Sequence, residues 1–348
     1  MNRHIINENA TLLEALGMLN AISGEAMTLF AVDDAGAMTG TLTDGDIRRG
    51  LLDGASPDWA VRRVMRRDFC RLSADDVDLA LLRDYRERGL RLIPLLKADR
   101  HISRVLDLSV TRTLLPLTAI LMAGGRGERL RPLTLTTPKP LLKIGGKAII
   151  DYNIENLARA GIDDIYVTVN YLADSLEEHF AQPVGGVGVK CVREPAFYGT
   201  IGSARLVDVA PGGTTLVMNS DLLTDISFEE MYMQHRASGA DITVASIPYN
   251  VAVPFAILQT EGDRVVSLQE KPSYNFYANA GIYMIANELL RSLPEGKRTD
   301  ATDLLEQAIA QGRKVTYFPI HGTWIDIGSP ADYERAQSIM HHRNMRTN

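Results

Sequence analysis

The sequence predicts an α/β protein in which a large, doubly wound mixed sheet follows a smaller α+β part. From Leu117 onward, strand-like apolar runs alternate with helical stretches, which is the pattern of a sheet covered by helices on both faces. Residues 1–115 contain shorter segments that recur with a period of roughly fifty to sixty residues. A glycine-rich loop follows the first strand of the large part. We therefore expect two domains, residues 1–115 and 118–348.

Composition narrows the class of protein. The 348 residues are 45% hydrophobic and 23% charged, values typical of an ordinary globular protein. A net charge of −6 argues against broad binding to nucleic acid or to anionic membranes. Cys70 and Cys191 lie far apart without metal-type spacing, which is typical of a reducing compartment. With no signal peptide and no apolar run near the ~20 residues of a membrane span, we expect a cytoplasmic protein.

The first part shows the same order of elements twice. Residues 10–20 have helical apolar spacing with Thr11 as a cap, and strand-like runs at 27–32 and 38–42 follow. A helix then opens at Thr43. The second copy has a helical stretch at 77–88 and strands at 91–96 and 102–106. This recurrence predicts two paired units that share one core.

The second part alternates strands and helices to its end. Apolar β-branched runs predict strands, Ser227 with Glu230 predicts a capping box, and Ser329-Pro330 predicts the start of the final helix. The expected strands are 117–123, 165–170, 187–192, 215–219, 242–247, 255–259, 265–269, 280–285 and 314–318, and the expected helices are 149–160, 174–180, 228–238, 303–311 and 330–341.

The loop after the first of these strands carries the strongest chemical signal. Gly124, Gly125 and Gly127 allow close backbone approach to a ligand, and successive free N–H groups form a cradle for an anion. Arg126 and Arg129 add forked donors, and Lys139 stands between two prolines. The alternative is an ordinary strand-to-helix turn with solvated arginines. The loop lacks the third glycine of a dinucleotide fingerprint and the Gly-Lys-Ser/Thr of a P-loop.

Other polar residues follow later strands, where ligands bind in open α/β sheets. Asp221 comes directly after the strand 215–219, and Asp326 lies in Trp324–Gly328. Glu270-Lys271-Pro272 and Asn279 flank the next strands. Each has a plain alternative, because aspartates commonly cap helices and Glu-Lys-Pro is a typical turn.

The segment Gly124–Pro140 resembles the signature of the sugar-1-phosphate nucleotidylyltransferases. It contains both parts of that signature, Gly-Gly-x-Gly-x-Arg-Leu-x-Pro-Leu-Thr and Pro-Lys-Pro. The later Asn-Ser-Asp and Trp-x-Asp-x-Gly segments stand in the family's order. The resemblance covers nearly all of residues 118–340 and implies a Rossmann-like fold and transfer of a nucleotidyl group to a sugar 1-phosphate. It also implies a Mg²⁺ cofactor on Asp221 and Asp326. The implied catalytic residues are Arg129, Lys139 and Asp221; those for the nucleotide are Ala123, Gly124, Gly125, Arg126, Gly127, Glu194, Gly199 and Thr200; those for the sugar phosphate are Glu270, Lys271 and Asn279.

One departure and one specificity signal accompany this resemblance. Glu128 stands where many family members have Thr or Ser, and we expect it to point away from the nucleotide. The segment Glu194–Ser203 resembles the family's base-recognition loop. In guanylyl-type members an acidic residue opens this loop, and a carboxylate can accept hydrogen bonds from guanine N1–H and N2–H₂ together. We therefore favour GTP, with UTP, CTP or dTTP as alternatives.

The first part resembles a tandem pair of CBS domains, on the residues Gly40–Arg49. The resemblance implies an adenine nucleotide bound through Thr43 and Asp46. The second repeat has Asp107 and Val110 at the matching positions, so one ligand site at most is supported. The alternative is that Thr43 caps a helix and the module only dimerises.

The leading hypothesis is a regulated sugar-1-phosphate guanylyltransferase, with a hexosamine 1-phosphate for nonulosonic-acid or surface-glycan synthesis as the acceptor by analogy. The alternatives are a catalytically silent nucleotide-sugar sensor and a glycosyltransferase of similar fold. We expect a homo-oligomer without nucleic-acid or membrane partners.

Overall fold

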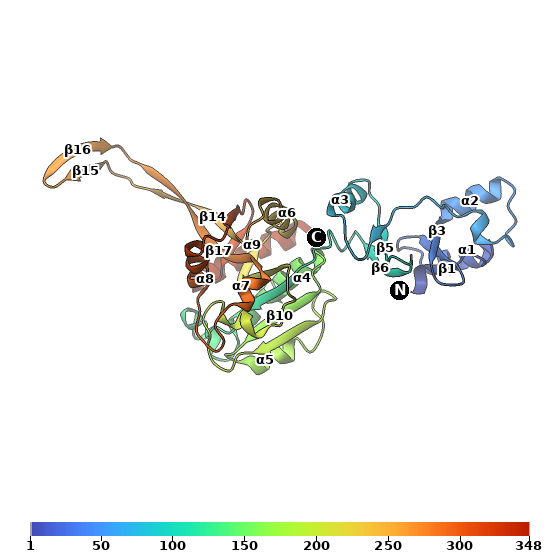
Figure 1. The fold of residues 1–348 in the computed structure, drawn as a ribbon. Coiled ribbons are helices and arrows are strands. Elements are labelled where there is room, and N and C mark those ends of the chain that lie inside the picture. Colours follow the sequence, from blue (N-terminus) through green and yellow to red (C-terminus); the bar gives the residue numbers. More distant parts are fainter. Residues whose placement is uncertain (1, 348) are drawn as a thin grey trace. The chain divides into compact units, whose positions relative to one another are not determined.

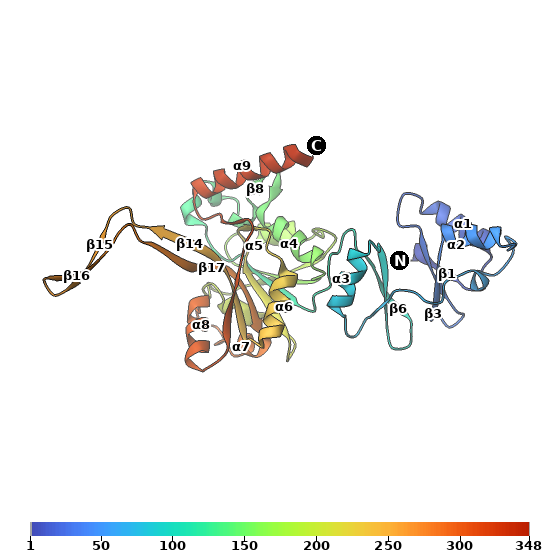
Figure 2. The same ribbon diagram turned by 90° about the horizontal axis from the view of Figure 1, so that it is seen from above.

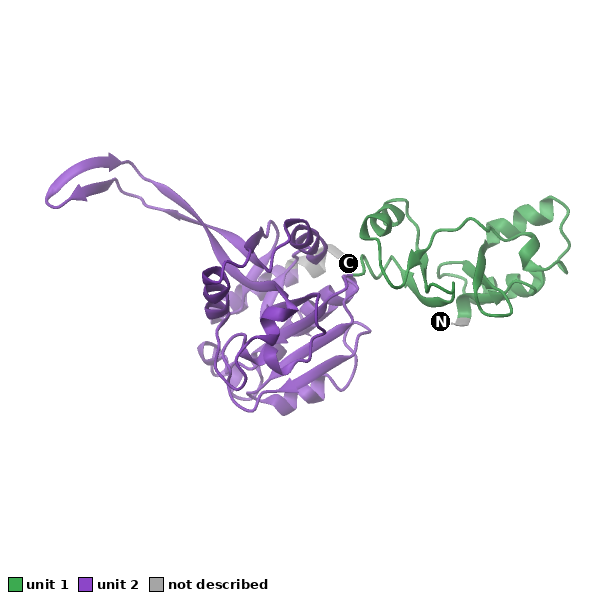
Figure 3. Cartoon of the chain, in the orientation of Figure 1, with its two compact units in different colours: residues 1–114 green, residues 115–348 purple. Residues whose placement is uncertain are grey.

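The chain folds into two compact units. The structure is a computed structural model that describes residues 2–347, with the side chains of residues 3–341. Unit 1 is Met1–Leu114 and unit 2 is Leu115–Asn348 (Figure 3). Among the described residues, none of the helices has the length and apolar character needed to cross a membrane.

Unit 1 contains two small sheets with the same strand arrangement. In each sheet the central strand pairs in parallel with one neighbour and antiparallel with the other. The sheet orders are β1-β2-β3 and β4-β5-β6. The elements of unit 1 are η1 (Asn2–His4), β1 (Ile5–Asn7), α1 (Leu12–Ala21), β2 (Thr28–Val32), β3 (Met38–Thr43), α2 (Asp44–Leu52), η2 (Val61–Arg63), β4 (Leu72–Ser73), α3 (Leu79–Glu87), β5 (Leu92–Leu96) and β6 (Ile102–Asp107).

The two halves of unit 1 meet in an apolar cluster. Phe30 and Met38 from the first half pack with Phe69 and Leu96 from the second. The backbone N–H of Met38 also donates to the carbonyl of Arg100 at 3.0 Å. The recurring segments of the sequence therefore share one packed interface. Their assignment to the CBS family stays a prediction.

Unit 2 is a mixed α/β domain. Its elements are β7 (Thr118–Met122), η3 (Glu128–Leu130), η4 (Leu133–Leu135), η5 (Lys139–Leu141), β8 (Lys143–Ile144), β9 (Lys147–Ala148), α4 (Ile149–Arg159), β10 (Asp164–Val169), α5 (Ala173–His179), β11 (Val189–Arg193), η6 (Gly202–Leu206), β12 (Thr214–Asn219), β13 (Leu222–Thr224), α6 (Phe228–Ser238), β14 (Ile242–Ala252), β15 (Ile257–Glu261), β16 (Arg264–Gln269), β17 (Ser273–Ala286), α7 (Asn287–Arg291), α8 (Ala301–Ala310), β18 (Val315–Pro319), β19 (Trp324–Asp326) and α9 (Pro330–Thr347).

The central sheet of unit 2 has seven strands in the order β11-β10-β7-β12-β17-β14-β18 (Figure 1). Only β17 runs against the others, so the sheet is parallel-dominated, as the sequence predicts. Ile120 and Val217 pack on the side of α7 and α8. Their strand neighbours Ala119, Leu121 and Leu216 are buried as well. Burial of successive strand residues means that both faces of the sheet are covered.

Two strands of this sheet continue past it as a long ribbon. β14 and β17 remain paired from Ile242↔Ile285 out to Ala252↔Ser273, and the β15–β16 hairpin forms the tip. The ribbon and its tip, residues 247–278, extend away from the body of unit 2 (Figures 1 and 2). We call this segment the arm. The sequence predicts only the inner parts of β14 and β17 because the outer parts contain Pro248, Asn250 and Asn275, which are weak strand formers.

The packing of β17 against β12 depends on a glycine. Gly281 has φ +70°, and a Cβ there would lie 2.5 Å from the Nδ2 of Asn219 at the end of β12. We expect Gly281→Ala to lower the free energy of unfolding by about 2–4 kcal/mol, from left-handed strain plus the clash. Chemical denaturation measures this.

Gly262→Ala is the matched control. Gly262 also has a left-handed φ, +62°, but open space where the Cβ would be. The Gly262→Ala variant should lower the free energy of unfolding by only about 1 kcal/mol, from the backbone strain alone. Equal losses in the two variants would contradict the role given to the contact with Asn219.

Candidate active site

The glycine-rich loop leaves β7 and turns sharply at Gly127. Gly127 has φ +59°, and a Cβ there would lie 2.9 Å from Thr134 and 3.1 Å from Lys139. The Thr134 hydroxyl donates to the Gly127 carbonyl at 2.8 Å. Only glycine fits this turn, because the chain must adopt a left-handed conformation while it touches Lys139.

Pairing of β13 with β19 brings together two aspartates that are distant in the sequence. Leu222 lies opposite Asp326 in this antiparallel pair, and the N–H of Ile327 donates to the Asp221 carbonyl at 3.2 Å. Ser220, just before Asp221, donates its hydroxyl to the Met122 carbonyl at 2.6 Å. The end of β12 is thereby tied to the end of β7, where the glycine-rich loop begins.

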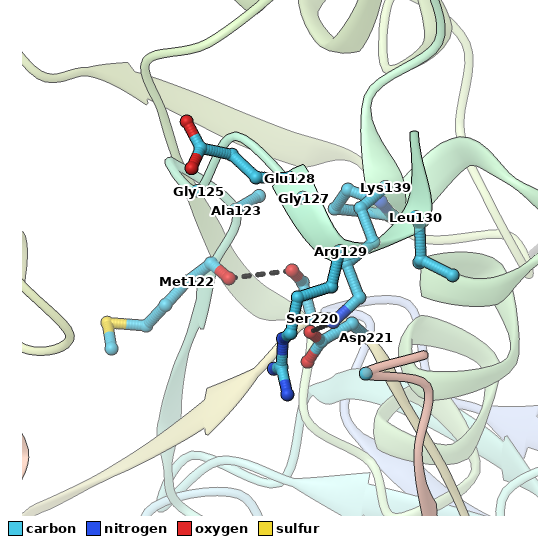
Figure 4. A pocket seen from close by; sticks show the side chains of 12 residues that line it. Met122, Ala123, Gly125, Gly127, Glu128, Arg129, Leu130, Lys139, Ser220 and Asp221 are labelled. Carbon is cyan, nitrogen blue, oxygen red and sulfur yellow. Dashed lines mark hydrogen bonds and ion pairs between the residues drawn. The ribbon is translucent and has the colours of Figure 1, made fainter. Parts of the chain in front are cut away.

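Lys139 lies between the two carboxylates. Its Nζ donates to Oδ2 of Asp221 and is 3.8 Å from Oδ1 of Asp326. The lysine side chain is only 11% exposed. Lys139 and Asp221 line a cavity of about 340 Å³, and Asp326 lies outside its lining. Figure 4 shows Lys139, Asp221 and Ser220 on one side of it and the glycine-rich loop on the other. The lining residues are Met122, Ala123, Gly125, Gly127, Glu128, Arg129, Leu130, Lys139, Pro140, Ser220, Asp221 and Gly328.

Arg129 reaches into the same cavity. A Cβ on Gly328 would lie 3.2 Å from the guanidinium of Arg129. The absence of a side chain at Gly328 therefore leaves room for this guanidinium. Glu128 forms an exposed ion pair with Arg131 at 3.4 Å. Its carboxylate points away from Lys139 and Asp221 in Figure 4. Two cationic groups therefore face the inside of the pocket.

The electrostatic balance at this point suits a divalent cation. Partial burial and the neighbouring Asp221 charge raise the pKa of Asp326, while Lys139 and Arg129 oppose that rise. Two carboxylates on one cation are the hard oxygen ligands that Mg²⁺ accepts, and Mg²⁺ completes its shell with water and substrate phosphates. Asp221 and Asp326 thus fit the expected magnesium ligands. Within the described residues, no group of three or more His, Cys, Asp and Glu side chains converges.

Glu194 packs directly against the glycine-rich loop. It is 5% exposed, and a Cβ on Gly124 would lie 2.5 Å from its Oε1. Burial raises the pKa of this carboxyl, and hydrogen bonds from Tyr198 N–H, Ser203 and Thr168 lower it in part. Within the described part of the chain no cation pairs with it. The carboxylate is thus buried beside the loop, and Glu194 is not among the residues that line the pocket.

Gly199 and Thr200 are held by the start of α8. Gly199 has φ +83°, and a Cβ there would lie 2.5 Å from the Thr299 carbonyl. The N–H of Thr200 donates to Asp300 at 2.9 Å, and its hydroxyl accepts from the N–H of Ala301 at 2.8 Å. These contacts fix the loop after Glu194, and neither residue lines the pocket.

The residues expected on the sugar side do not line the pocket either. Glu270 and Lys271 are exposed in the arm, immediately after β16. Asn279 lies in β17, where its amide donates to Tyr283 at 2.9 Å and its carbonyl oxygen accepts from the N–H of Gly281. Arg126 is an exposed loop residue outside the lining. Of the residues expected to bind phosphate and cation, Arg129, Lys139 and Asp221 therefore line the pocket, whereas Arg126, Asp326, Glu270, Lys271 and Asn279 do not.

In unit 1, Thr43 and Asp46 form a capping box at the start of α2. Asp46 Oδ2 accepts from the N–H and hydroxyl of Thr43, at 3.0 and 2.6 Å, and Oδ1 accepts from Arg49 and Arg66, at 2.5 and 2.8 Å. Despite burial, these hydrogen bonds lower the pKa of Asp46. Both carboxylate oxygens are engaged within the chain, as in the helix-cap alternative, so a ribose diol would have to displace one of the arginines.

Comparison with known proteins assigns unit 2 to a family. Residues 118–343 match the nucleotidyl transferase family. The chain belongs to this family. Residues 1–114 lie outside the matched region.

Several curated relatives are named as mannose-1-phosphate guanyltransferases. The mannose-1-phosphate guanyltransferase of Neurospora crassa is 32% identical over 228 residues, and that of Debaryomyces hansenii is 30% identical over 230 residues. Each match covers 62% of this chain and 62% of the relative, so the chain spans less than two thirds of the length of these curated relatives. Among solved structures, HddC from Yersinia pseudotuberculosis aligns with a TM-score of 0.51 and 22% identity, covering 64% of this chain and 99% of HddC. At that identity the likeness concerns the fold alone.

Sequence reasoning did not single out several residues that build the pocket. Met122, Leu130 and Pro140 line it with apolar groups, and Thr134 holds the Gly127 turn from outside the lining. These four residues all lie within Ile120–Pro140, which was the only indication in the sequence. The turn at Gly127 determines which of their side chains face the cavity.

The contact between Gly124 and Glu194 gives a testable expectation. Gly124→Ala should lower the free energy of unfolding of unit 2 by about 1–3 kcal/mol, because its Cβ would meet the buried carboxylate. Gly125→Ala is the matched control, since a Cβ there meets no atom within 4 Å, and it should stay within about 0.5 kcal/mol of the wild type. Urea unfolding followed by circular dichroism compares the two, and equal losses would contradict the contact.

The pKa of Glu194 predicts how stability depends on pH. A raised pKa in the folded state gives a stabilising contribution that is present at low pH and lost as pH rises through that pKa. Glu194→Gln removes the buried charge, so its free energy of unfolding should exceed that of the wild type at pH 8. The difference should shrink towards pH 5. Denaturation at the two pH values measures it.

The exposed Glu178→Gln is the matched control for this pH series. It removes one carboxylate without changing a buried group. A Glu194→Gln difference that grows as the pH falls would contradict the predicted sign.

Proposed function

We propose that unit 2 transfers a nucleotidyl group from a nucleoside triphosphate, GTP in the first place, to a sugar 1-phosphate and releases pyrophosphate. The observation that carries the proposal is the convergence of Lys139, Arg129 and Asp221 at one cavity beside the glycine-rich loop, with Oδ1 of Asp326 3.8 Å from the Nζ of Lys139. Membership of the nucleotidyl transferase family supports the same reaction class.

In this reaction an oxygen of the sugar 1-phosphate attacks the α-phosphorus of the nucleotide and the bond to pyrophosphate breaks. Phosphoryl chemistry of this kind depends on positioning and on neutralising negative charge more than on a protein nucleophile. The backbone of Ala123–Gly127 would hold the triphosphate, and Arg129 would neutralise its charge. Lys139 stands where it can release Asp221 and turn to phosphate oxygens.

Mg²⁺ is the cofactor we propose, held by Asp221 and Asp326. When bound, it neutralises phosphate charge and orients the reacting oxygens. In its absence the ammonium group of Lys139 is the cation next to the two carboxylates. Binding of the metal would therefore free Lys139 for the nucleotide.

Glu194 supports guanine as the base. Its carboxylate is buried against Gly124, and two oxygens on one carboxylate match the N1–H and N2–H₂ donors of guanine, which uracil and thymine do not offer. The relatives named as guanyltransferases support the same base. Gly199 and Thr200 would then act by fixing the loop that follows Glu194.

Two sugar 1-phosphates are candidates for the acceptor. The names of the relatives suggest mannose 1-phosphate, and the sequence analogy suggests a hexosamine 1-phosphate. Glu270, Lys271 and Asn279 are proposed for the sugar phosphate, and an adenine nucleotide at Thr43 and Asp46 of unit 1 stays a prediction.

Pyrophosphate release tests the proposed reaction. The full chain is assayed with Mg²⁺ and GTP, UTP, CTP, dTTP or ATP against mannose, glucose and hexosamine 1-phosphates. We expect turnover with GTP and one acceptor. Asp221→Asn should reduce kcat about 10²- to 10³-fold, because the proposed Mg²⁺ that neutralises transition-state charge would lose a carboxylate ligand.

Ile309→Ser, which alters an exposed residue of α8, is the control and should keep full activity. Turnover with UTP or dTTP in place of GTP would overturn the role of Glu194. Release of nucleoside diphosphate instead of pyrophosphate would identify a glycosyltransferase. Nucleotide binding without turnover would identify a sensor.

A further inference from the structure

Two residues, Ser220 and Asp221, connect β12 of the central sheet to β13 of the β13–β19 pair. The backbone of this connection is buried, since Ser220 is 2% exposed and Leu222, the first residue of β13, is fully buried. Buried carbonyl groups need hydrogen-bond donors. The groups that supply those donors therefore fix the backbone from which the Asp221 carboxylate extends.

The side chain of Asn153, in α4, supplies donors on both sides of Asp221. Its Nδ2 donates to the carbonyl of Leu222 at 2.8 Å and to the carbonyl of Ser220 at 3.4 Å, the longer and weaker bond. Two carbonyl acceptors require the NH₂ end of the amide, because its oxygen would be repelled by them. Asn153 is 2% exposed and does not line the pocket.

The other ties of the connection come from backbone groups and from Ser220 itself. The N–H of Ile327, directly after β19, donates to the Asp221 carbonyl at 3.2 Å. The hydroxyl and the N–H of Ser220 donate to the Met122 carbonyl at 2.6 and 3.3 Å. Among these ties, only the one from Asn153 is made by a side chain outside the connection. A substitution can therefore remove it without changing a group in the pocket.

The helix that carries Asn153 also holds the segment of Lys139. The N–H of Ile149, the first residue of α4, donates to the Leu142 carbonyl at 3.0 Å, and the N–H of Leu142 donates to the Lys139 carbonyl at 3.1 Å. Ile149 and Leu142 share an apolar cluster with residues of β13 and β19. One helix thus contacts both partners of the ion pair, Lys139 through η5 and Asp221 through Asn153.

We propose that Asn153 is a positioning residue for the reaction. It fixes the backbone on both sides of Asp221, so that the carboxylate meets Lys139 in the unliganded chain and the metal when substrates are bound. Asn153 acts only through Asp221. A displacement of about 1 Å in a reacting group can cost on the order of 10²-fold in rate. The proposal rests on the proposed function, in which Asp221 holds Mg²⁺.

Hydrogen exchange of the full chain tests the positioning without any assay of activity. Asn153→Leu keeps the approximate size of the side chain and removes its donors. The N–H of Ile327 should then exchange about tenfold faster, because its acceptor on Asp221 is held less firmly. The N–H of Val167, in the centre of β10, reports on opening of the whole sheet and should change much less.

Asn156→Leu is the matched control. Asn156 lies one turn further along α4, and its Nδ2 is buried without a hydrogen-bond partner in the described residues. The control removes an amide from the same helix without removing a bond, so the exchange rate at Ile327 should stay at the wild-type value. Asn153→Ser provides a second variant should Asn153→Leu fail to fold, because a helical serine can bond the carbonyl four residues earlier.

Two exchange results would overturn the proposal. One is an unchanged rate at Ile327 in a folded Asn153 variant. The other is an equal acceleration at Ile327 and Val167, which would show that Asn153 only stabilises unit 2 as a whole.

Pyrophosphate release then separates positioning from a purely structural role. Asn153→Leu should lower kcat by about tenfold or more and leave the KM for GTP within about twofold. In the Asp221→Asn background the same change should lower kcat by less than about twofold, because the carboxylate that Asn153 positions is absent. Asn156→Leu should keep the wild-type kcat.

Equal fold losses from Asn153→Leu in the two backgrounds would show that Asn153 does not act through Asp221, and the proposal would be wrong. A wild type that releases no pyrophosphate with any substrate would instead contradict the proposed function. The exchange rates at Ile327 and Val167 still decide in that case whether Asn153 holds the connection at Asp221.

Discussion

The charge cluster of Lys139, Asp221 and Asp326 is the interaction on which the arrangement of unit 2 depends. The two aspartates come from segments distant in the sequence, and β13–β19 pairing sets them side by side. Like charges held that close, in a partly buried position, are unfavourable without a cation. Lys139 supplies the cation from a segment stiffened by Pro138 and Pro140. The same three residues thus balance their charges within the chain and form the site proposed for a metal and phosphates.

Glycines decide how closely the surrounding segments approach this cluster. Gly124 lets the Glu194 carboxylate lie against the loop, Gly127 lets the chain turn over Lys139, and Gly328 leaves room for the Arg129 guanidinium. Each contact joins the glycine-rich loop or its arginine to a different part of unit 2. The loop is therefore packed on several sides before any ligand is present, which is the preorganisation that binding of a charged phosphate chain requires.

The arm, unlike the body of unit 2, leaves its strands uncovered. In the body of unit 2 each strand is paired and covered, whereas the ribbon of β14 and β17 continues without a third strand and exposes aromatic side chains. The hydrophobic effect favours removal of that surface from water.

Patterns of neighbouring residues determined much of this fold. Apolar periodicity and caps were enough to predict β7, α4, β12 and α8 to within a few residues, because those elements are specified locally. The glycine and proline spacing of Ile120–Pro140 predicts a phosphate-binding loop, and this role stays a prediction. The tertiary structure alone decided that Lys139 pairs with Asp221 and that Glu194 is buried without a cation. It also decided that β14 and β17 continue into an arm in which Glu270 and Lys271 are exposed and do not line the pocket. These features depend on strand pairing and packing between residues far apart in the chain, which no local pattern encodes.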